Sequence, residues 1–396
     1  MNHFSDTIKD EYMKQKTRIL YLIPSLRIGG AERVCLNLAD NLDYNAFEVN
    51  IISLSEEMPL IKLFKNKDKI AIYSCREPHN LGFPWISFSG LYRFYKLVNQ
   101  INPQVVHSHL WGRHCIYLYL FLFKRGKISF VSTIHSSEFI YISTKPIYKL
   151  FRWVESFAYK ILNFRLIVIS EAVKKTTIKT LSFKEIIQIE NGIDTDYFKP
   201  EQRIKYTGFK DRLYKNKFPI LIHVGRNGEA KRQVDIIKAI PFLRKSYPNL
   251  RVILIGRDNK INNLDLIRKL EVEEFIEFIE YSDDPLKFLS IADIAVFPSL
   301  YEGLSLSLME MMSCGLPLIV TNVASLTEMT NGSEAAMVVP TKSPEEIAKK
   351  VALLASNRNL CQEIGSKARN IAVKRYSKKR MIVKHEELYK RINVEN

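Results

Sequence analysis

The sequence has few cysteines and no long apolar segment. Its five cysteines among 396 residues follow no spacing typical of a metal site or a disulfide framework, so we expect buried free thiols in a reducing compartment. The longest apolar run, Cys115–Phe123, is far shorter than the roughly 20 residues that cross a bilayer. The N-terminal stretch is polar and lacks the apolar core of a secretory signal. We therefore expect a cytoplasmic protein, either free or peripheral on the inner face of the cytoplasmic membrane.

Acidic residues are scarce relative to basic ones. Lys and Arg number 59 against 42 Asp and Glu, which gives a formal net charge of +17. This balance favours an anionic partner: a nucleic acid, an anionic lipid or a phosphorylated substrate. Apolar residues make up 46% and charged residues 26%, a composition typical of a globular protein with a full core.

Short apolar runs alternate with helical patterns along both halves of the chain. The run Arg18–Ile23 is continuously apolar, as expected of a strand covered on both faces, and helical spacing follows at 31–39. Repetition of this pattern predicts an α/β protein with two doubly wound parallel sheets. We expect domains at 1–200 and 201–377, with the charged stretch 199–217 as linker and a ligand site in the cleft between the domains.

Glycines and histidines follow strands of the first half. Gly29 and Gly30 come after the first strand and before a helix, where backbone can approach a phosphate closely; a plain turn explains them equally. His107 and His109 are two positions apart and so share one face of a strand, and His135 ends another strand. These histidines could be polar groups that line a site, or they could be packed in the core without a function. They could also be metal ligands, but no third ligand stands at a suitable spacing.

Cations follow a strand of the second half. Arg226 and Lys231 lie just beyond Ile220–Val224. An arginine fork and a lysine point charge can together hold a diphosphate, although a solvated basic loop has the same composition.

Two glutamates lie in a strand–loop–helix–strand segment. Glu302 is in the loop after Ile294–Phe297, and Glu310 lies inside the helical pattern Leu306–Met312. The start of that helix offers free backbone N–H groups to a phosphate, and the carboxylates suit sugar hydroxyls. Paired carboxylates can also be the acid and base of a glycoside hydrolase, but the position of Glu310 within the helix argues against that reading.

Seven segments taken in order resemble one known family. They are PSLRIGGAERV (24–34), VVHSHLWG (105–112), STIHSSEF (132–139), VISEAV (168–173), IENGIDTDYF (189–198), GRNGEAK (225–231) and PSLYEGLSLSLMEMMSCGLPLIVTNVASLTEM (298–329). Together they resemble the family 4 retaining glycosyltransferases of GT-B fold, over nearly the whole chain. The resemblance implies two Rossmann-like domains that face each other across a cleft, with the C-terminal helix, about 378–396, crossing back to the first domain.

The resemblance also implies roles for the site residues. Arg226 and Lys231 bind the donor diphosphate and stabilise it as leaving group, Glu302 holds hydroxyls of the donor sugar, and Glu310 binds the ribose. Tyr281 lies in the loop that contacts the base. The complete donor-binding set implied is Gly29, Gly30, Arg226, Lys231, Tyr281, Glu302, Gly303, Leu304, Ser305, Leu306 and Glu310.

Histidines complete the implied site. His109 lies near the transferred sugar and joins Arg226, Lys231 and Glu302 as a catalytic residue, while His107 and His135 contact the acceptor or the sugar. The resemblance implies no metal and no other cofactor, since the cations take over the stabilisation of charge.

The implied reaction transfers a hexose-type sugar from a nucleotide diphosphate, with uridine as the expected base, and retains the anomeric configuration. We expect a glycan or lipid-linked acceptor in bacterial surface polysaccharide biosynthesis. The stretch Thr144–Phe164 mixes cations with aromatic residues at helical spacing and is a candidate for contact with an anionic membrane. Two alternatives remain: a nucleotide-sugar epimerase of GT-B fold, and a basic nucleic-acid-binding protein, although no nucleic-acid-binding motif is present.

The sequence departs from the family pattern near the implied donor site. Leu304-Ser305 stands where many members have Phe-Gly, Ser307 replaces a common proline, and Arg232 stands where glycine often follows the lysine. The pocket for the donor sugar is the part most affected by these departures.

Overall fold

The chain folds into two compact units. The structure, a computed structural model, describes residues 16–27, 29–77, 87–109, 128–135, 163–181 and 186–394, with several residues between 149 and 160. The units are Met1–Glu190 with Met381–Asn396, and Asn191–Arg380. The domains expected from the sequence are 1–200 and 201–377. The chain passes from the first unit to the second after residue 190, ten residues earlier than expected.

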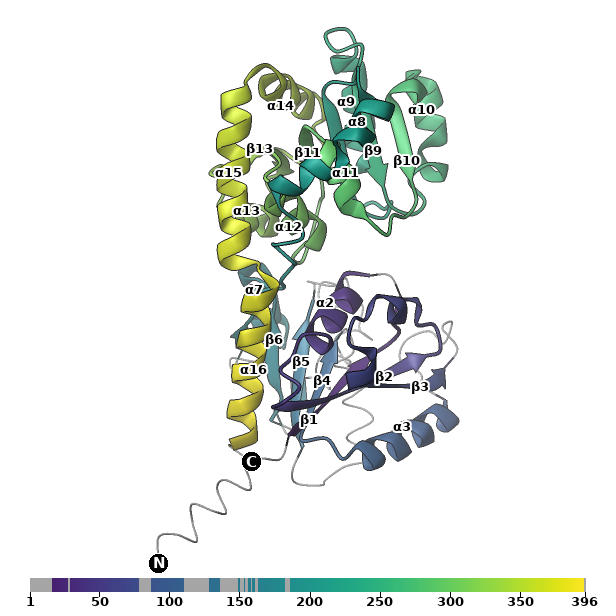
Figure 1. Cartoon of the computed structure of the whole chain (residues 1–396), viewed down its shortest axis with the longest axis vertical. Coiled ribbons are helices and arrows are strands. Elements are labelled where there is room, and N and C mark those ends of the chain that lie inside the picture. Colours follow the sequence, from purple (N-terminus) through teal and green to yellow (C-terminus); the bar gives the residue numbers. More distant parts are fainter. Residues whose placement is uncertain are drawn as a thin grey trace, which may run out of the picture. The chain divides into compact units, whose positions relative to one another are not determined.

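In the described part of the first unit, seven parallel strands form one sheet in the order β3-β2-β1-β4-β5-β6-β7 (Figure 1). The strands are β1 (Thr17–Ile23), β2 (Phe47–Ser55), β3 (Ile70–Glu77), β4 (Val105–His109), β5 (Ser129–Ile134), β6 (Arg165–Val168) and β7 (Ile186–Gln188). The helices are α2 (Gly30–Ala39), α3 (Phe88–Ile101), α7 (Glu171–Leu181) and the C-terminal α16 (Lys378–Val394), with short 3₁₀ turns η1 (Pro59–Leu63) and η2 (Lys67–Lys69).

The second unit, described throughout, has six parallel strands in the order β10-β9-β8-β11-β12-β13. They are β8 (Ile220–Val224), β9 (Arg251–Ile255), β10 (Ile276–Ile279), β11 (Ile294–Phe297), β12 (Leu318–Thr321) and β13 (Met337–Val339). The helices are α8 (Thr207–Tyr214), α9 (Gln233–Leu243), α10 (Leu264–Leu270), α11 (Pro285–Ile291), α12 (Leu306–Ser313), α13 (Ala324–Thr330), α14 (Pro344–Ser356) and α15 (Arg358–Arg375), with 3₁₀ turns η3 (Pro200–Tyr206), η4 (Ile261–Asn263) and η5 (Glu273–Phe275).

Both sheets are doubly wound, which confirms the predicted α/β architecture. In each sheet the first strand, β1 or β8, has its successor β2 or β9 on one side and a later strand, β4 or β11, on the other. The strand order therefore reverses between β1 and β4 and between β8 and β11. Ligands of open α/β sheets bind outside the carboxyl ends of the strands at such reversals. The loops after these four strands are thus the places to look for a site.

The apolar runs form strands because both faces of each sheet are covered. In β1, Ile19 to Ile23 are fully buried, and in β12 all four residues are buried. Side chains that alternate between two covered faces must all be apolar, which explains why these strands are continuous apolar runs and not alternating ones.

The predicted linker at 199–217 is wrong. These residues form η3 and α8 within the second unit. The charges have partners far along the chain: Arg203 Nε donates to Ser290 O at 2.9 Å, and Lys210 Nζ lies 3.3 Å from Asp293 Oδ1. A charged stretch without an apolar pattern is therefore held here by hydrogen bonds and ion pairs to α11 and its C-terminal end.

The two segments that cross between the units are bonded to each other. Ile193 N donates to Tyr376 O at 2.9 Å, and Lys378 N donates to Ile193 O at 2.7 Å. A Cβ on Gly192 would lie 2.7 Å from Ser377 O, so only glycine permits this close approach.

The predicted membrane segment, Thr144–Phe164, lies mostly outside the described residues. Of those described, Trp153 and Phe157 are 65% and 50% exposed, and their rings stack with centroids 5.7 Å apart. Among the helices that the structure describes, none has the length and apolar character needed to span a bilayer.

Candidate active site

Two adjacent strands of the second unit end in loops that bond to each other. Strands β8 and β11 pair in parallel, and each runs into a loop at its carboxyl end. Leu300 N in the loop after β11 donates to Ala230 O in the loop after β8, at 2.8 Å. This contact brings the predicted cations and the first predicted glutamate to one place.

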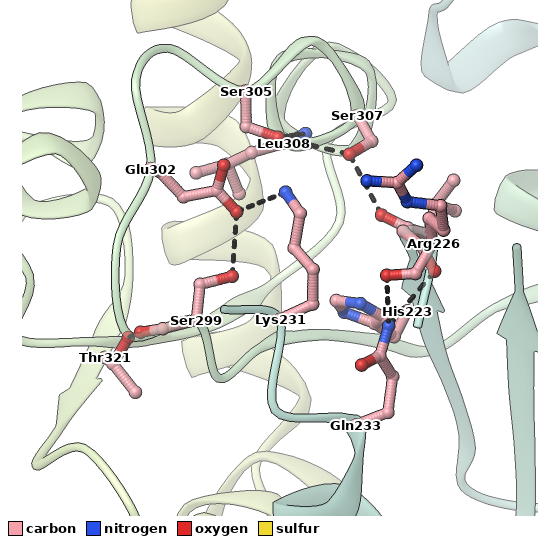
Figure 2. Close-up of polar contacts among 12 residues, drawn as sticks. His223, Arg226, Lys231, Gln233, Ser299, Glu302, Ser305, Ser307, Leu308 and Thr321 are labelled. Carbon is pink, nitrogen blue, oxygen red and sulfur yellow. Dashed lines mark hydrogen bonds and ion pairs between the residues drawn. The ribbon is translucent and has the colours of Figure 1, made fainter. Parts of the chain in front are cut away.

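Lys231 and Glu302 form an ion pair between these loops. The distance from Lys231 Nζ to Glu302 Oε1 is 2.5 Å, and Ser299 Oγ donates to the same oxygen at 2.8 Å (Figure 2). The side chain of Glu302 is 8% exposed and that of Lys231 is 26% exposed. The ammonium group also lies 5.5 Å from the centroid of the Phe297 ring, a favourable position for a cation. The Glu302 carboxylate is largely shielded from water, so solvent weakens its attraction to Lys231 less than it would weaken that of a fully exposed pair.

The start of α12 is fixed by two serines. Ser305 is the N-cap residue, and its Oγ accepts from Leu308 N at 3.4 Å and lies 3.1 Å from Ser307 Oγ. Ser307 Oγ donates to Val224 O, the last residue of β8, at 3.0 Å (Figure 2). The departures Ser305 and Ser307 therefore cap α12 and hold its start against the end of β8. Glu310 lies further along α12 and is buried.

The backbone turn that carries Arg226 is held by side chains. Gln233 Nε2 donates to Gly225 O and Arg226 O, each at 3.1 Å, and Asn259 Nδ2 lies 3.3 Å from Gly225 O. Gly256 has φ +144°, and a Cβ there would lie 2.1 Å from Gly225 O. The Arg226 backbone is thus rigid, whereas its side chain is exposed and accessible to a ligand.

His223 lies buried beneath the cations. Its Nδ1–H donates to Val296 O at 3.0 Å, and its Nε2 has no hydrogen-bond partner among the described residues. Burial lowers the pKa of His223 to about 4, against the raising effect of the Val296 carbonyl and with a lowering contribution from Lys231. His223 is therefore neutral at neutral pH and adds no positive charge next to Lys231.

The predicted histidines of the first unit form one buried cluster. His107 Nδ1 lies 2.6 Å from Tyr389 Oη, and its Nε2 lies 2.7 Å from Thr133 Oγ1. His109 Nδ1 lies 2.9 Å from His135 Nε2. The His107 and His109 rings have centroids 4.3 Å apart, as expected for residues on one face of a strand.

Every histidine in this cluster is held neutral by its surroundings. Burial lowers the pKa of His107 and His109 well below the usual value, and neighbouring histidines lower it further. The same causes lower the pKa of His135 to about 3, and burial lowers that of His385 to about 4. The cluster can therefore offer hydrogen bonds to a ligand but carries no charge at neutral pH.

Two members of this cluster come from α16 and were missed by sequence reasoning. His385 stacks on His107 with ring centroids 5.7 Å apart, and the Tyr389 hydroxyl is hydrogen-bonded to His107. Their spacing of four along a helix puts both on one face, which is a usable signal. Nothing in the sequence indicates that this face meets β4, however.

Gly29 and Gly30 lie at the start of α2. Gly29 is the N-cap residue, and a Cβ there would lie 2.2 Å from Glu32 Oε2. A Cβ on Gly30 would meet no described atom within 4 Å, so the backbone there is open to approach. Burial raises the pKa of Glu32 despite the lowering effect of its own backbone hydrogen bond.

The structure brings some of the predicted site residues together. Lys231 contacts Glu302 directly, and Gly303 to Leu306 lead from that loop into α12. Tyr281, in the loop after β10, is 42% exposed. The residues that belong to the first unit are Gly29, Gly30, His107, His109 and His135. Among the described residues, no three His, Cys, Asp or Glu side chains gather in a way that could hold a metal ion.

Comparisons with known proteins identify the class. Residues 28–197 match the family described as Glycosyltransferase Family 4, and residues 207–371 match Glycosyl transferases group 1. Together with the two doubly wound sheets, these matches define a glycosyltransferase of the GT-B type. The chain belongs to glycosyltransferase family 4.

Individual relatives cover most of the chain. It is 26% identical over 332 residues, 80% of this chain and 81% of the relative, to the Escherichia coli UDP-Gal:alpha-D-GlcNAc-diphosphoundecaprenol alpha-1,3-galactosyltransferase. It is 22% identical over 371 residues, 91% of this chain and 94% of the relative, to the Bacillus anthracis N-acetyl-alpha-D-glucosaminyl L-malate synthase. Anabaena HepE, solved in complex with UDP, matches the fold with a TM-score of 0.76 at 16% identity, over 94% of this chain and 99% of that one.

Proposed function

We propose that this glycosyltransferase moves a hexose-type sugar from a UDP-sugar to a glycan or lipid-linked acceptor in bacterial surface polysaccharide biosynthesis. The observation that carries the proposal is the Lys231–Glu302 pair, which joins the loops after β8 and β11 at the reversal of strand order. Two likenesses support the donor and acceptor: Anabaena HepE was solved with UDP, and the name of the Escherichia coli relative states a UDP-Gal donor and a diphosphoundecaprenol acceptor.

The donor is held at both of its ends. Lys231 has three N–H donors, so it can bind a diphosphate oxygen while it keeps its contact with Glu302. Arg226 adds a planar fork that suits two phosphate oxygens. The other oxygen of the Glu302 carboxylate, Oε2, accepts hydrogen bonds from sugar hydroxyls, and Glu310 accepts from the ribose. The capped start of α12 presents backbone N–H groups to the diphosphate.

The reaction retains the anomeric configuration. The bond between the anomeric carbon and the diphosphate oxygen breaks, and the acceptor oxygen bonds to that carbon from the same face. The proton of the acceptor hydroxyl passes to the departing diphosphate, so the protein supplies no nucleophile. Arg226 and Lys231 stabilise the charge that develops on the leaving group, and no metal or other cofactor takes part.

One histidine of the first unit, His109, binds the transferred sugar in this proposal. His109 is held by His135 and stays neutral, so it exchanges hydrogen bonds with the transferred sugar without adding charge. His107, fixed between Tyr389 and Thr133, supports the ring of His109.

Donor screening with a matched pair of variants tests the proposal. The wild-type protein should release UDP from one of several UDP-hexoses in the presence of polyprenyl-diphosphate-linked sugar acceptors. Lys231→Ala should lose about 3 kcal/mol of barrier stabilisation, roughly a hundredfold or more in kcat, by comparison with lost oxyanion donors. Lys238→Ala, which removes an exposed lysine from α9, should stay within about twofold.

Near-normal turnover by Lys231→Ala would contradict the role of Lys231 in stabilising the leaving diphosphate. If the protein converts the donor sugar to its epimer in the absence of an acceptor, its activity is epimerisation and not sugar transfer.

We further propose that the protein associates peripherally with an anionic membrane, where a lipid-linked acceptor resides. The net charge of +17 and the exposed Trp153 and Phe157 support this. Sedimentation with anionic vesicles should be strong at low salt and weak at high salt, because exposed charges are screened. Absence of binding to anionic vesicles at low salt would contradict the proposed membrane association.

A further inference from the structure

The segment IENGIDTDYF has no role in the proposed mechanism, yet its backbone is held firmly. Asp194 Oδ1 accepts from Tyr197 N at 3.0 Å. Arg369 Nη1 donates to Phe198 O at 2.8 Å, and Ser313 Oγ donates to the same carbonyl at 2.5 Å. This part of the chain therefore lies against the C-terminal end of α12 and presents Tyr197 in one orientation.

The hydroxyl of Tyr197 is tied to the loop after β10. Tyr197 Oη donates to Asp284 Oδ1 at 2.8 Å, and Tyr206 Oη donates to Asp284 Oδ2 at 2.7 Å. Asp284 is three residues beyond Tyr281 and immediately precedes α11. A carboxylate that accepts from two tyrosines holds both rings in place.

The same hydroxyl lies within electrostatic reach of Glu310. Ser313, which bonds to the Phe198 carbonyl, is one helical turn beyond Glu310 on α12, so both face the segment that carries Tyr197. Burial and the Asp284 hydrogen bond raise the pKa of Tyr197, and the Glu310 carboxylate raises it further. Tyr197 is thus bonded to the loop of Tyr281 and is close enough to the Glu310 carboxylate to interact with it electrostatically.

A large part of the Tyr197 ring remains accessible. The residue is 42% exposed although its hydroxyl is bonded, and its ring meets the Phe198 ring edge-on with centroids 4.9 Å apart. An exposed aromatic face whose polar end is fixed suits contact with a flat heterocycle, because stacking needs little further ordering of the side chain.

We propose that Tyr197 is a specificity residue for the nucleoside half of the donor, with its ring packed against the heteroaromatic base. This rests on the proposed function, which assigns the ribose to Glu310 and the base to the loop of Tyr281. Asp284 is a positioning residue that fixes the ring through its hydroxyl. The segment IENGIDTDYF therefore contributes to recognition of the donor.

Calorimetric titration with two probes separates this role from a structural one. UDP carries the base, and inorganic diphosphate carries only the charges that Arg226 and Lys231 bind. Tyr197→Ala should raise the Kd of UDP by roughly 10- to 100-fold, the loss expected for one stacked base, and leave the Kd of diphosphate within about twofold. Tyr197→Phe keeps the ring and should recover most of the UDP affinity.

Tyr206→Phe is the matched control, because it removes the hydrogen bond to the other oxygen of Asp284 without touching the exposed ring. It should bind UDP as the wild type does. An unchanged Kd of UDP for Tyr197→Ala, or an equal loss of UDP and diphosphate affinity, would overturn the inference. Failure of the proposed function gives a different result: Lys231→Ala then leaves the Kd of inorganic diphosphate unchanged.

Discussion

Lowering the pH from 7 to 5 should destabilise the first unit far more than the second. His107, His109 and His385 are almost fully buried in the first unit, and burial lowers the pKa of each. Below pH ~6.5 the unfolded chain takes up protons at these positions, whereas the folded chain does not. The unfolded state therefore gains stability as the pH falls, until the pH reaches the folded pKa, which is about 4 for His385.

The size of this effect follows from the unfolded pKa alone, as long as the folded pKa lies below 5. Each buried histidine then costs about 2 kcal/mol of unfolding free energy at pH 5. His135 and His385, with pKa values of about 3 and about 4, cost about 4 kcal/mol together, and the lowered pKa values of His107 and His109 add to this cost. His223 is the single histidine in the sequence 191–380, so the second unit should lose only about 2 kcal/mol.

The chain provides its own probe of the first unit. Its three tryptophans, Trp85, Trp111 and Trp153, all lie between residues 1 and 190. Urea denaturation followed by tryptophan fluorescence at a series of pH values therefore reports the first unit, and far-ultraviolet circular dichroism reports both units. The fluorescence transition should move to much lower urea as the pH falls, ahead of the remaining change in circular dichroism.

His385→Asn is the matched variant. An asparagine can still donate to Met381 O, which His385 Nδ1 contacts at 2.8 Å, but it does not titrate. The variant should lose about 2 kcal/mol less than the wild type between pH 7 and 5. Equal pH dependence of the two proteins, or a fluorescence transition that does not move, would refute the account of buried neutral histidines.

Two substitutions test the loop that carries the cations. Arg232 has φ +53° and forms a two-point ion pair with the buried Asp235 at 2.6 and 2.9 Å, so Arg232→Gly relieves backbone strain but strands a buried carboxylate. We expect a net loss of about 2 kcal/mol by urea denaturation, largely restored by adding Asp235→Asn; a gain in stability would contradict the role of the pair. Gly256→Ala places a Cβ 2.1 Å from Gly225 O and should cost about 3 kcal/mol or more together with most diphosphate affinity, whereas unchanged calorimetric binding would show that the turn can relax.

The strands could be predicted because burial on two faces leaves a strong local signal. The bounds expected for β8 and β11 agree with the structure, since each is a short apolar run with abrupt ends. The stretch 199–217 was mispredicted because its order depends on distant partners. Tyr214, for example, is buried and bonds through its hydroxyl to Glu277, 63 residues further on.

The candidate site was only partly predictable for the same reason. The family resemblance singled out Lys231 and Glu302, but their contact over 71 residues depends on the pairing of β8 with β11. The contact of Tyr389 with His107 spans 282 residues and depends on the placement of α16. A sequence pattern indicates which residues face the same way on one element, and it carries no information on which distant element they meet.

The first and last segments of the second unit are hydrogen-bonded to each other, so its two ends lie side by side. Because Ile193 exchanges backbone hydrogen bonds with Tyr376 and Lys378, the chain enters and leaves Asn191–Arg380 at one place. Domains whose ends lie together tolerate transfer into other chains. We expect residues 191–380 to be exchangeable between relatives as one continuous cassette, which under the proposed function combines the donor preference of one enzyme with the acceptor preference of another.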